Sequence, residues 1–353
     1  MLNNRSYKYA GNDESSEDNL QFNYLSQESE NKFRAENSIF SKGYTLQYGM
    51  NYEFSRYLIE NYDTKFTDQN GLPRDVSSIS LFNSYGAFVM GSKKYFNDRL
   101  IVNLGLRMDG SDFGETAKNP LNQLSPRFST SYQLKDNLFW NASAGIYYQK
   151  PPYTVLGFQN NEGVFENQVN DVKFMRSTHY ITGFEWQFPA KNRKLSAEVF
   201  YKSYANYPSS IRNGIALANL GADFGVIGNE PVTSDAKGRA YGLELLAQQR
   251  LFSGFYGIAA LTLVRSEFTN PNTGYLPSSW DNRFIVSLTA GKRFSKDWEL
   301  GARWRFLGGT PYTPYDLESS SLRANWDLYN SGRFDFTRIN GERLKSFHQL
   351  DLR

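Results

Sequence analysis

The acidic residues that could bind a metal ion form one short group, Asp109, Asp112 and Glu115. Carboxylates spaced in this way can supply the oxygen ligands that Ca²⁺ prefers, and residues 68–71 (DQNG) offer a second, weaker candidate. Both groups lie in or at the start of long polar segments, where solvated loop charges explain them more simply. The sequence therefore predicts no metal site and no cofactor.

Residue sets that could catalyse a reaction are missing or misplaced. The two histidines, His179 and His348, are far apart and lie near the starts of predicted strands. The sequence contains neither a GxSxG nucleophile elbow nor an HExxH zinc motif. The run from Gly86 to Lys93 resembles a phosphate-binding loop, but its lysine is displaced by one position and the segment has a strand pattern. These features predict that the chain is not an enzyme.

Residues that could capture a solute lie in three long segments, 150–176, 207–237 and 309–344. The first two are rich in Asn, Gly, Pro and Ser, which tolerate turns. Their Tyr, Asn and Arg side chains can stack on a solute and donate hydrogen bonds to it. The prolines and glycines are better explained as residues that shape the loops. The predicted ligand-facing residues are Tyr153, Asn160, Asn161, Arg212, Asn213, Tyr312 and Tyr315.

The segments that separate these loops alternate between apolar and polar residues. From Tyr44 to Ser55 every second residue is large and apolar, and the residues between them are polar or glycine. Similar alternation recurs in 99–108, 194–203 and 298–306, and the polar side of the last segment carries Arg303 and Arg305. Charged residues in those positions cannot face a dry core, so they face solvent or a polar lumen. We therefore predict that Arg303 and Arg305 face a lumen.

The connections between predicted strands alternate between tight turns and long loops. Antiparallel neighbours with short turns at one rim and long loops at the other are typical of an up-and-down transmembrane barrel. The predicted strands are 31–41, 43–58, 79–95, 98–110, 125–134, 138–149, 177–188, 193–206, 238–250, 254–268, 280–293, 297–308 and 345–353.

Composition agrees with a barrel. Aromatic residues make up 16% of the 353 residues although the mean hydropathy is −0.59, a combination that suits a lipid-exposed apolar face and a wet polar face. The net charge of +3 and the lack of Lys/Arg clusters argue against nucleic acid as a partner. No apolar run is long enough for a transmembrane helix, and the lack of cysteine excludes disulfides and thiolate metal sites.

Five segments carry a family resemblance. They are YYQKPPY (147–153), RAYGLELLAQQR (239–250), WDNRFIVSLTAGKRF (280–294), LGARWRFLGGTPYTPYD (300–316) and FHQLDLR (347–353). Each motif is weak alone, but their order and spacing over residues 31–353 resemble the C-terminal barrel part of a TonB-dependent outer-membrane receptor, in the style of the Bacteroidetes-type receptors.

The resemblance implies an all-β, up-and-down antiparallel transmembrane β-barrel in the outer membrane of a Gram-negative bacterium. It also implies a barrel of roughly 22 strands, of which about 13 are predicted here. We expect residues 1–30 to be a polar, loop-like segment and residues 31–353 to be a barrel fragment without the plug and final strands. We also expect that both ends are cut.

The implied function is uptake of a scarce solute, such as a siderophore, cofactor, glycan or peptide, energised by TonB. The implied partners are the TonB complex, through parts of the receptor outside this sequence, outer-membrane lipid, the solute and a surface lipoprotein. Two alternatives stay open: a passive porin or barrel enzyme of the outer membrane, and a soluble β-rich binding module.

Overall fold

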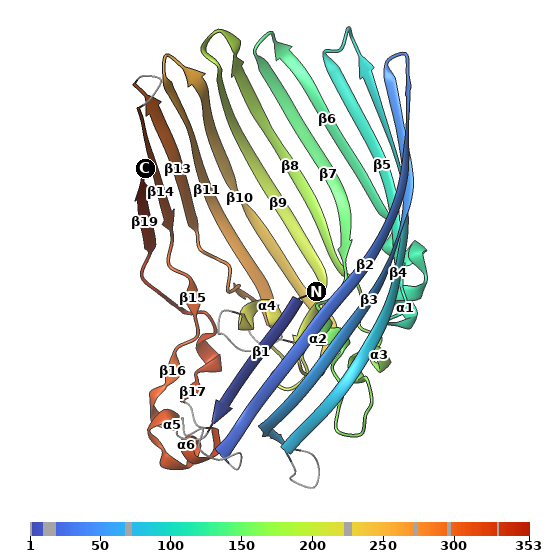
Figure 1. The fold of residues 1–353 in the computed structure, drawn as a ribbon, viewed down its shortest axis with the longest axis vertical. Coiled ribbons are helices and arrows are strands. Elements are labelled where there is room, and N and C mark those ends of the chain that lie inside the picture. Colours follow the sequence, from blue (N-terminus) through green and yellow to red (C-terminus); the bar gives the residue numbers. More distant parts are fainter. Residues whose placement is uncertain are drawn as a thin grey trace.

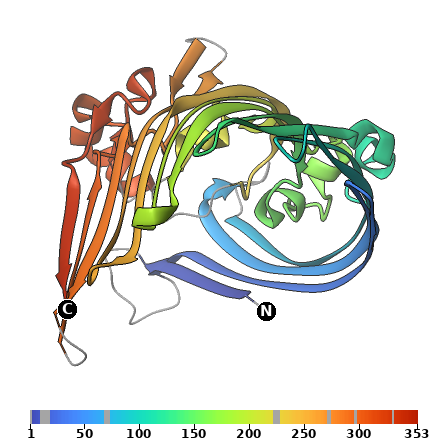
Figure 2. The same ribbon diagram turned by 90° about the horizontal axis from the view of Figure 1, so that it is seen from above.

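A computed structural model describes residues 2–9, 19–67, 73–221, 228–270, 274–294, 298–329 and 332–353. Its main element is an antiparallel sheet of 15 strands that curves into a partial barrel (Figures 1 and 2). Strands that are neighbours in sequence are neighbours in the sheet, except that β11 pairs with both β12 and β13 and that β14 pairs with β19. The structure confirms the predicted all-β, up-and-down antiparallel fold.

The long strands carry the sheet and two small hairpins lie outside it. The sheet strands are β1 (Leu2–Tyr9), β2 (Leu20–Ser41), β3 (Tyr44–Thr67), β4 (Pro73–Tyr95), β5 (Leu100–Ser111), β6 (Ser125–Lys135), β7 (Leu138–Gln149), β8 (Met175–Phe188), β9 (Arg193–Ser210), β10 (Val232–Phe252), β11 (Phe255–Asn270), β12 (Gly274–Pro277), β13 (Phe284–Arg293), β14 (Glu299–Leu307) and β19 (Phe347–Leu352). The two hairpins pair β15 (Pro311–Tyr312) with β18 (Glu342–Arg343) and β16 (Tyr315–Asp316) with β17 (Arg333–Phe334).

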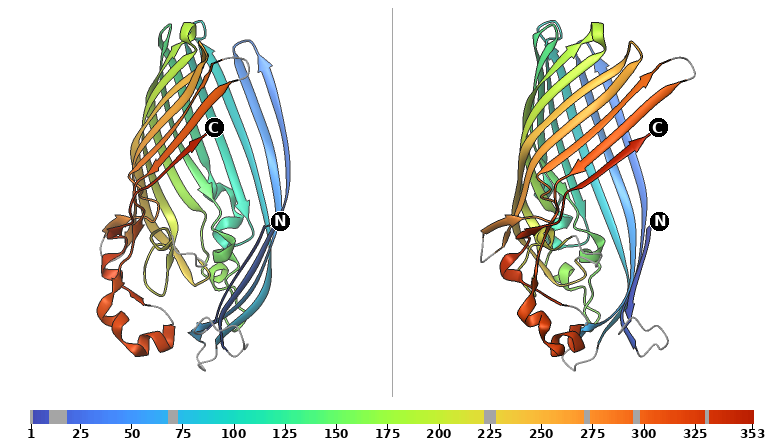
Figure 3. Two further views of the ribbon diagram at one scale, coloured as in Figure 1. Left: turned by 60° about the vertical axis from the view of Figure 1, so that its left-hand side comes forward. Right: turned by 90° about the vertical axis from the view of Figure 1, so that its left-hand side faces the viewer.

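The two rims of the sheet differ as predicted. Figures 1 and 3 show short turns at one rim and long connections with short helices at the other. At the turn rim, Ser253 and Gly254 both have positive φ, 50° and 78°, which suits the tight hairpin that joins β10 to β11. The helices of the loop rim are α1 (Glu115–Lys118), α2 (Tyr153–Leu156), α3 (Glu166–Val169), α4 (Leu217–Leu220), α5 (Leu317–Ser321) and α6 (Arg323–Tyr329).

The sheet has one polar face and one apolar face. Figure 2 shows α2 and α3 inside the curve, and Tyr153 of α2 contacts Glu30 and Ser55, so these residues lie on the concave face. Side chains alternate between faces along a strand, which places Met50 on the convex face, where it is 61% exposed. The strand register carries this assignment around the sheet and places Leu104, also 61% exposed, on the convex face.

The expectation for residues 1–30 was wrong where the structure describes them. Residues 2–9 form β1, and β2 begins at Leu20 rather than at residue 31. Residues 22–30 pair with 55–63 beyond the alternating segment that starts at Tyr44. In this extension Tyr24 and Tyr57 are buried under the loops, so the strand lacks the extended apolar–polar alternation of a lipid-facing segment.

Several glycines of the sheet face an aromatic ring on the neighbouring strand. Gly242 pairs directly with Phe200, and a Cβ atom on this glycine would lie 2.8 Å from the ring and 2.1 Å from the Leu263 carbonyl oxygen. Gly49 stands in the same relation to Phe88. Each ring therefore packs against glycine backbone, where any side chain would clash with it. Each glycine–aromatic pair helps to fix the register of the two strands that carry it.

The sheet is not closed. The strand order begins at β1 and ends at β19, so each of these strands has one edge without a neighbouring strand among the described residues. Among those same residues, no helix is long and apolar enough to cross a membrane.

Candidate functional site

The first long loop folds back into the concave side of the sheet and is held by Tyr153. Its ring stacks between Tyr57 and Phe82, with centroid distances of 5.9 and 5.8 Å. Its hydroxyl donates a hydrogen bond to Glu30 Oε1 at 2.8 Å and lies 2.8 Å from Ser55 Oγ. Burial raises the pKa of Tyr153, so its phenol stays neutral and keeps these bonds. Tyr153 is therefore an anchor for the loop.

Lys150 reinforces this anchor with charge. Its ammonium group forms an ion pair with Glu53 and donates a hydrogen bond to Ser84 Oγ at 3.2 Å. It also lies 3.3 Å from the Tyr153 hydroxyl. Lys150 and Glu53 are both largely buried, with side chains 21% and 16% exposed. The root of the loop is thus tied to β3 and β4 by both stacking and an ion pair.

Buried asparagines join this loop to the second long loop. Asn167 is fully buried and its amide donates to the carbonyl oxygens of Val155 and Glu230, at 2.8 and 2.9 Å. Its Oδ1 accepts from the Val232 backbone at 2.8 Å. One side chain therefore satisfies backbone groups of both loops, and its loss would leave those groups buried without partners.

Arg74, near the start of β4, joins the same two loops from the strand side. It donates to the Gln159 carbonyl at 2.8 Å and to Asn229 Oδ1 at 3.2 Å. Its guanidinium also stacks over the Phe158 ring at 4.4 Å. Arg74 is only 3% exposed, so it acts inside the loop assembly and not at its surface.

The third long loop is joined to the second in the same way. The Asn340 amide donates to the carbonyl oxygens of Asn219 and Pro277, at 2.9 and 2.8 Å. Asn219 in turn donates to the Phe268 carbonyl at 3.3 Å. The side chains of Asn167, Asn219, Asn229 and Asn340 link the three loops and β11, and we call these four residues the asparagine links.

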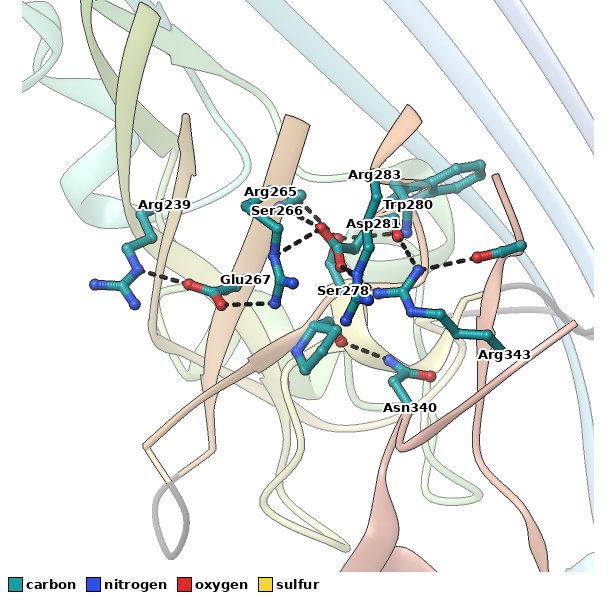
Figure 4. A network of polar contacts seen from close by, with 12 residues as sticks. Arg239, Arg265, Ser266, Glu267, Ser278, Trp280, Asp281, Arg283, Asn340 and Arg343 are labelled. Carbon is teal, nitrogen blue, oxygen red and sulfur yellow. Dashed lines mark hydrogen bonds and ion pairs between the residues drawn. The ribbon is translucent and has the colours of Figure 1, made fainter. Parts of the chain in front are cut away.

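An ion-pair network supports the third loop next to these links (Figure 4). Asp281 is fully buried and forms ion pairs with Arg265, Arg283 and Arg343; its Oδ1 also accepts from the Ser266 backbone at 2.9 Å. The Arg343 guanidinium reaches the Gly309 carbonyl at 2.9 Å as well. Asp281 therefore connects β11 and the start of β13 with the loop before β19.

The concave wall below the loops contains a cavity of about 470 Å³ whose lining includes three arginines, Glu36 and aromatic rings, and Glu36 forms an ion pair with Arg34. The guanidinium of Arg127 lies over the Tyr147 ring at 4.5 Å, and that of Arg34 lies over the Phe88 ring at 5.3 Å. Arg107 also lines this cavity. It forms a two-point ion pair with Asp109, at 2.5 and 2.7 Å. Such a wall can stack on a planar solute and attract an anionic one.

The predicted ligand-facing residues are not brought together into one site. Tyr153 is buried, as described above, because its ring fills the stack between Tyr57 and Phe82. Asn160 and Asn213 stabilise turns, since their side-chain oxygens accept from the backbone of Val164 and Ile215. The remaining four are exposed on three separate loops: Asn161, Arg212, Tyr312 and Tyr315.

Arg303 and Arg305 lie on one face of β14, and the strand register connects this face to the concave face. They pair with Asp351 and Gln349 of β19, and Arg305 Nη2 donates to Gln349 Oε1 at 2.5 Å. Their position in the lumen of a closed barrel stays a prediction.

The acidic group of the sequence does not converge. Asp112 accepts hydrogen bonds from Asn83, and Glu115 pairs with Lys118, while Asp109 pairs with Arg107. Among the described residues, no group of three or more potential metal ligands is close enough to hold a metal ion. The second candidate, residues 68–71, lies outside the described residues.

Sequence reasoning missed the asparagine links and the arginines of the wall. Asparagine is common in loops, so nothing in the sequence separates a buried link from an ordinary turn residue. A signal did exist for the wall, because Arg107 and Arg127 both stand at polar positions of alternating strands. Only the register of β5 and β6 shows that the two side chains share one face.

Comparison with solved structures shows the same fold at low identity. The ferric enterobactin receptor PfeA of Pseudomonas aeruginosa matches with a TM-score of 0.65 and 15% identity, over 99% of this chain and 50% of that one. The ferripyoverdine receptor of the P. aeruginosa outer membrane matches with a TM-score of 0.61 and 16% identity, over 99% of this chain and 46% of that one. The copper transporter OprC matches with a TM-score of 0.61 and 14% identity, over 96% of this chain and 51% of that one. The chain thus spans about half the length of these relatives.

The family assignment rests on the sequence. No curated protein matches the chain. The model of the family described as "TonB dependent receptor-like, beta-barrel" matches residues 2–353. Members of this family are outer-membrane receptors and transporters rather than enzymes, and the expected Bacteroidetes subtype stays a prediction. This chain belongs to the TonB-dependent receptor β-barrel family.

Proposed function

We propose that the chain forms the barrel wall of an outer-membrane receptor that takes up a scarce solute with energy supplied through TonB. The observation that carries this proposal is the two-faced sheet, whose convex face exposes apolar residues while its concave face carries paired charges. A wall of this kind separates lipid from a polar passage. Membership of the family supports the energised mechanism.

The solute is proposed to be anionic or planar. The sequence did not decide between a siderophore, a cofactor, a glycan and a peptide. The concave wall with Arg34, Arg107 and Arg127 favours a solute that can accept hydrogen bonds from guanidinium groups. The named relatives include receptors for ferric siderophores and a copper transporter, which favours a metal complex as cargo.

The proposed partners follow from the same mechanism. The TonB complex would act through parts of the receptor outside this chain, and outer-membrane lipid would cover the convex face. A surface lipoprotein could contact the loop rim. The exposed loop residues Asn161, Arg212, Tyr312 and Tyr315 are the proposed first contacts for the solute, and Arg303 and Arg305 are the proposed lumen residues.

The test is uptake of radioactive iron, presented as a set of ferric siderophores, by cells with and without the gene. We expect saturable uptake that needs the gene, needs TonB and stops when an uncoupler removes the proton-motive force. Entry that needs the gene but continues without TonB would overturn the energised mechanism and indicate a passive porin. If no ferric siderophore enters in a gene-dependent manner, the same assay is repeated with copper, and failure of both rejects metal cargo.

A further inference from the structure

A groove of about 670 Å³ lies on the convex face of the sheet, across β5 to β9. The register places most of its lining side chains on the same face as Leu104. Gly105, Arg127 and Gly145 also line it, although the register assigns these three residues to the concave face. Its lining combines the small residues Pro126 and Ala144 with the larger apolar residues Phe128, Ile146 and Tyr180. This apolar lining suits an acyl chain.

One end of this groove is formed by Arg176, the second residue of β8. In the part of the chain that the structure describes, Arg176 takes part in no ion pair, and its guanidinium has no hydrogen-bond partner. The hydroxyl-bearing residues Thr178 and Ser203 line the same end. The end of the groove is therefore cationic and rich in donors, while the rest is apolar.

The position of Arg176 along the strand matches the edge of a bilayer. It lies at the loop rim, and the convex side chains that follow it along β8 include Tyr180, Phe184 and Trp186. Trp186 is near the opposite, turn rim. Ten residues of strand span roughly 33 Å, and with the usual tilt this covers the apolar band of about 25 Å that such barrels present to lipid.

We propose that this groove binds one lipid with a phosphorylated headgroup, whose acyl chain lies in the groove and whose phosphate contacts the Arg176 guanidinium. An arginine binds phosphate through two parallel hydrogen bonds and is more easily desolvated than a lysine. The inference rests on the outer-membrane location proposed above.

Other arginines of the convex face differ from Arg176 because they already have partners. Arg193 lines a second groove, of about 420 Å³, but its Nε donates to Gln249 Oε1 at 3.0 Å. Arg239 and Arg265 both pair with Glu267. The Arg176 guanidinium, in contrast, has no ion-pair or hydrogen-bond partner among the described residues, so its charge is available to a ligand.

The test measures lipid binding to the full-length protein in detergent by native mass spectrometry. The probes are a phosphatidic acid, a diacylglycerol with the same chains, and inorganic phosphate. We expect one phosphatidic acid bound, with affinity about 10-fold or more above the diacylglycerol, because only the phosphate can form charge-assisted hydrogen bonds with Arg176. Arg176→Gln should abolish this preference and Arg176→Lys should restore part of it.

Two further variants separate the charge from the groove. Ala144→Trp places a large side chain in the groove without changing its charge, and it should also weaken phosphatidic acid binding about 10-fold or more. Lys173→Gln removes one positive charge from an exposed residue near the same rim and should leave binding unchanged. Heat-dependent gel migration of each variant shows whether the barrel is folded.

Three results would overturn the proposal. They are equal binding of the two lipids, loss of binding in Lys173→Gln to the same extent as in Arg176→Gln, and displacement of phosphatidic acid by inorganic phosphate at equal concentration. The last result would indicate a site for a free anion. Failure of solute uptake in the preceding test does not affect this measurement, so the two proposals can fail separately.

Discussion

At the scale of single residues, the side chains that were expected to meet a ligand serve two purposes. Tyr153 was expected at the surface because tyrosine is suited to stacking on solutes, but here it stacks on Tyr57 and Phe82 and fixes a loop root. Tyr312, which is 40% exposed, is still available for a solute. The residue type predicts stacking in both cases, but only the fold decides what is stacked.

Tyr153→Phe should loosen the first loop without unfolding the sheet. The variant keeps the ring stack but removes the hydroxyl that bonds Glu30 and lies against Ser55, which should cost about 1–2 kcal/mol. Hydrogen exchange of the backbone in residues 153–174 should become roughly 5- to 30-fold faster. Tyr312→Phe is the control, since the Tyr312 hydroxyl has no partner among the described residues. Equal exchange in both variants would contradict the anchoring role.

Asp281→Asn should destabilise the region where β11, β13 and the third loop meet. The change leaves Arg265, Arg283 and Arg343 close together without the central carboxylate, and breaking a buried ion pair costs roughly 3–5 kcal/mol. Urea unfolding followed by gel migration measures the loss. Glu318→Gln changes an exposed carboxylate of the same loop and should stay within about 0.5 kcal/mol of the parent protein.

At the scale of elements, the strands within the apolar band were predictable and those beyond it were not. The period-two pattern predicted β5 to β7 within about two residues of their observed bounds. It failed for β1 and for the first part of β2, where the inward residue Tyr24 packs in the core beneath the loops and the regular alternation of the lipid-facing strands is absent. For the concave wall, the sequence predicted only that these positions are polar. It could not predict that Arg107 and Arg127 lie close together, because strand register depends on contacts between distant parts of the chain.

Gly242→Ala should weaken the pairing of β9, β10 and β11. Its Cβ atom would meet the Leu263 carbonyl oxygen and the Phe200 ring, and such overpacking costs about 1–3 kcal/mol. Gly91→Ala is a matched control on β4, because a Cβ atom there has no neighbour within 4 Å. Urea midpoints that fall equally in both variants would show that strand glycine is costly for reasons other than the facing ring.

At the scale of the whole molecule, the sheet formed by the described residues ends at two strands with free edges, β1 and β19. Backbone groups at such edges have no water to bond with inside a bilayer, and each unpaired group costs several kcal/mol. The family fold solves this by closing the barrel. The isolated chain of residues 1–353 therefore lacks a way to satisfy both edges in lipid.

We expect this isolated chain not to insert stably into lipid vesicles. After refolding in their presence it should be extracted by carbonate, and it should migrate on a gel at the same position with and without boiling. The full-length receptor is the control and should show heat-dependent migration. A heat-modifiable band from residues 1–353 alone would contradict the expectation and would imply that the edges pair with each other or with a second copy.

If the proposed uptake function holds, the asparagine links bear on how the receptor could change its cargo over evolutionary time. Surface loops usually accept insertions and substitutions freely, but here a change at Asn167 or Asn340 would disturb two loops at once. New specificity is therefore easiest to gain at the exposed loop residues, such as Asn161, Arg212 and Tyr312, while the asparagine links stay constant. Related receptors that adopt new cargo should differ at exposed loop residues long before they differ at the asparagine links, and grafted binding sequences should leave these links unchanged.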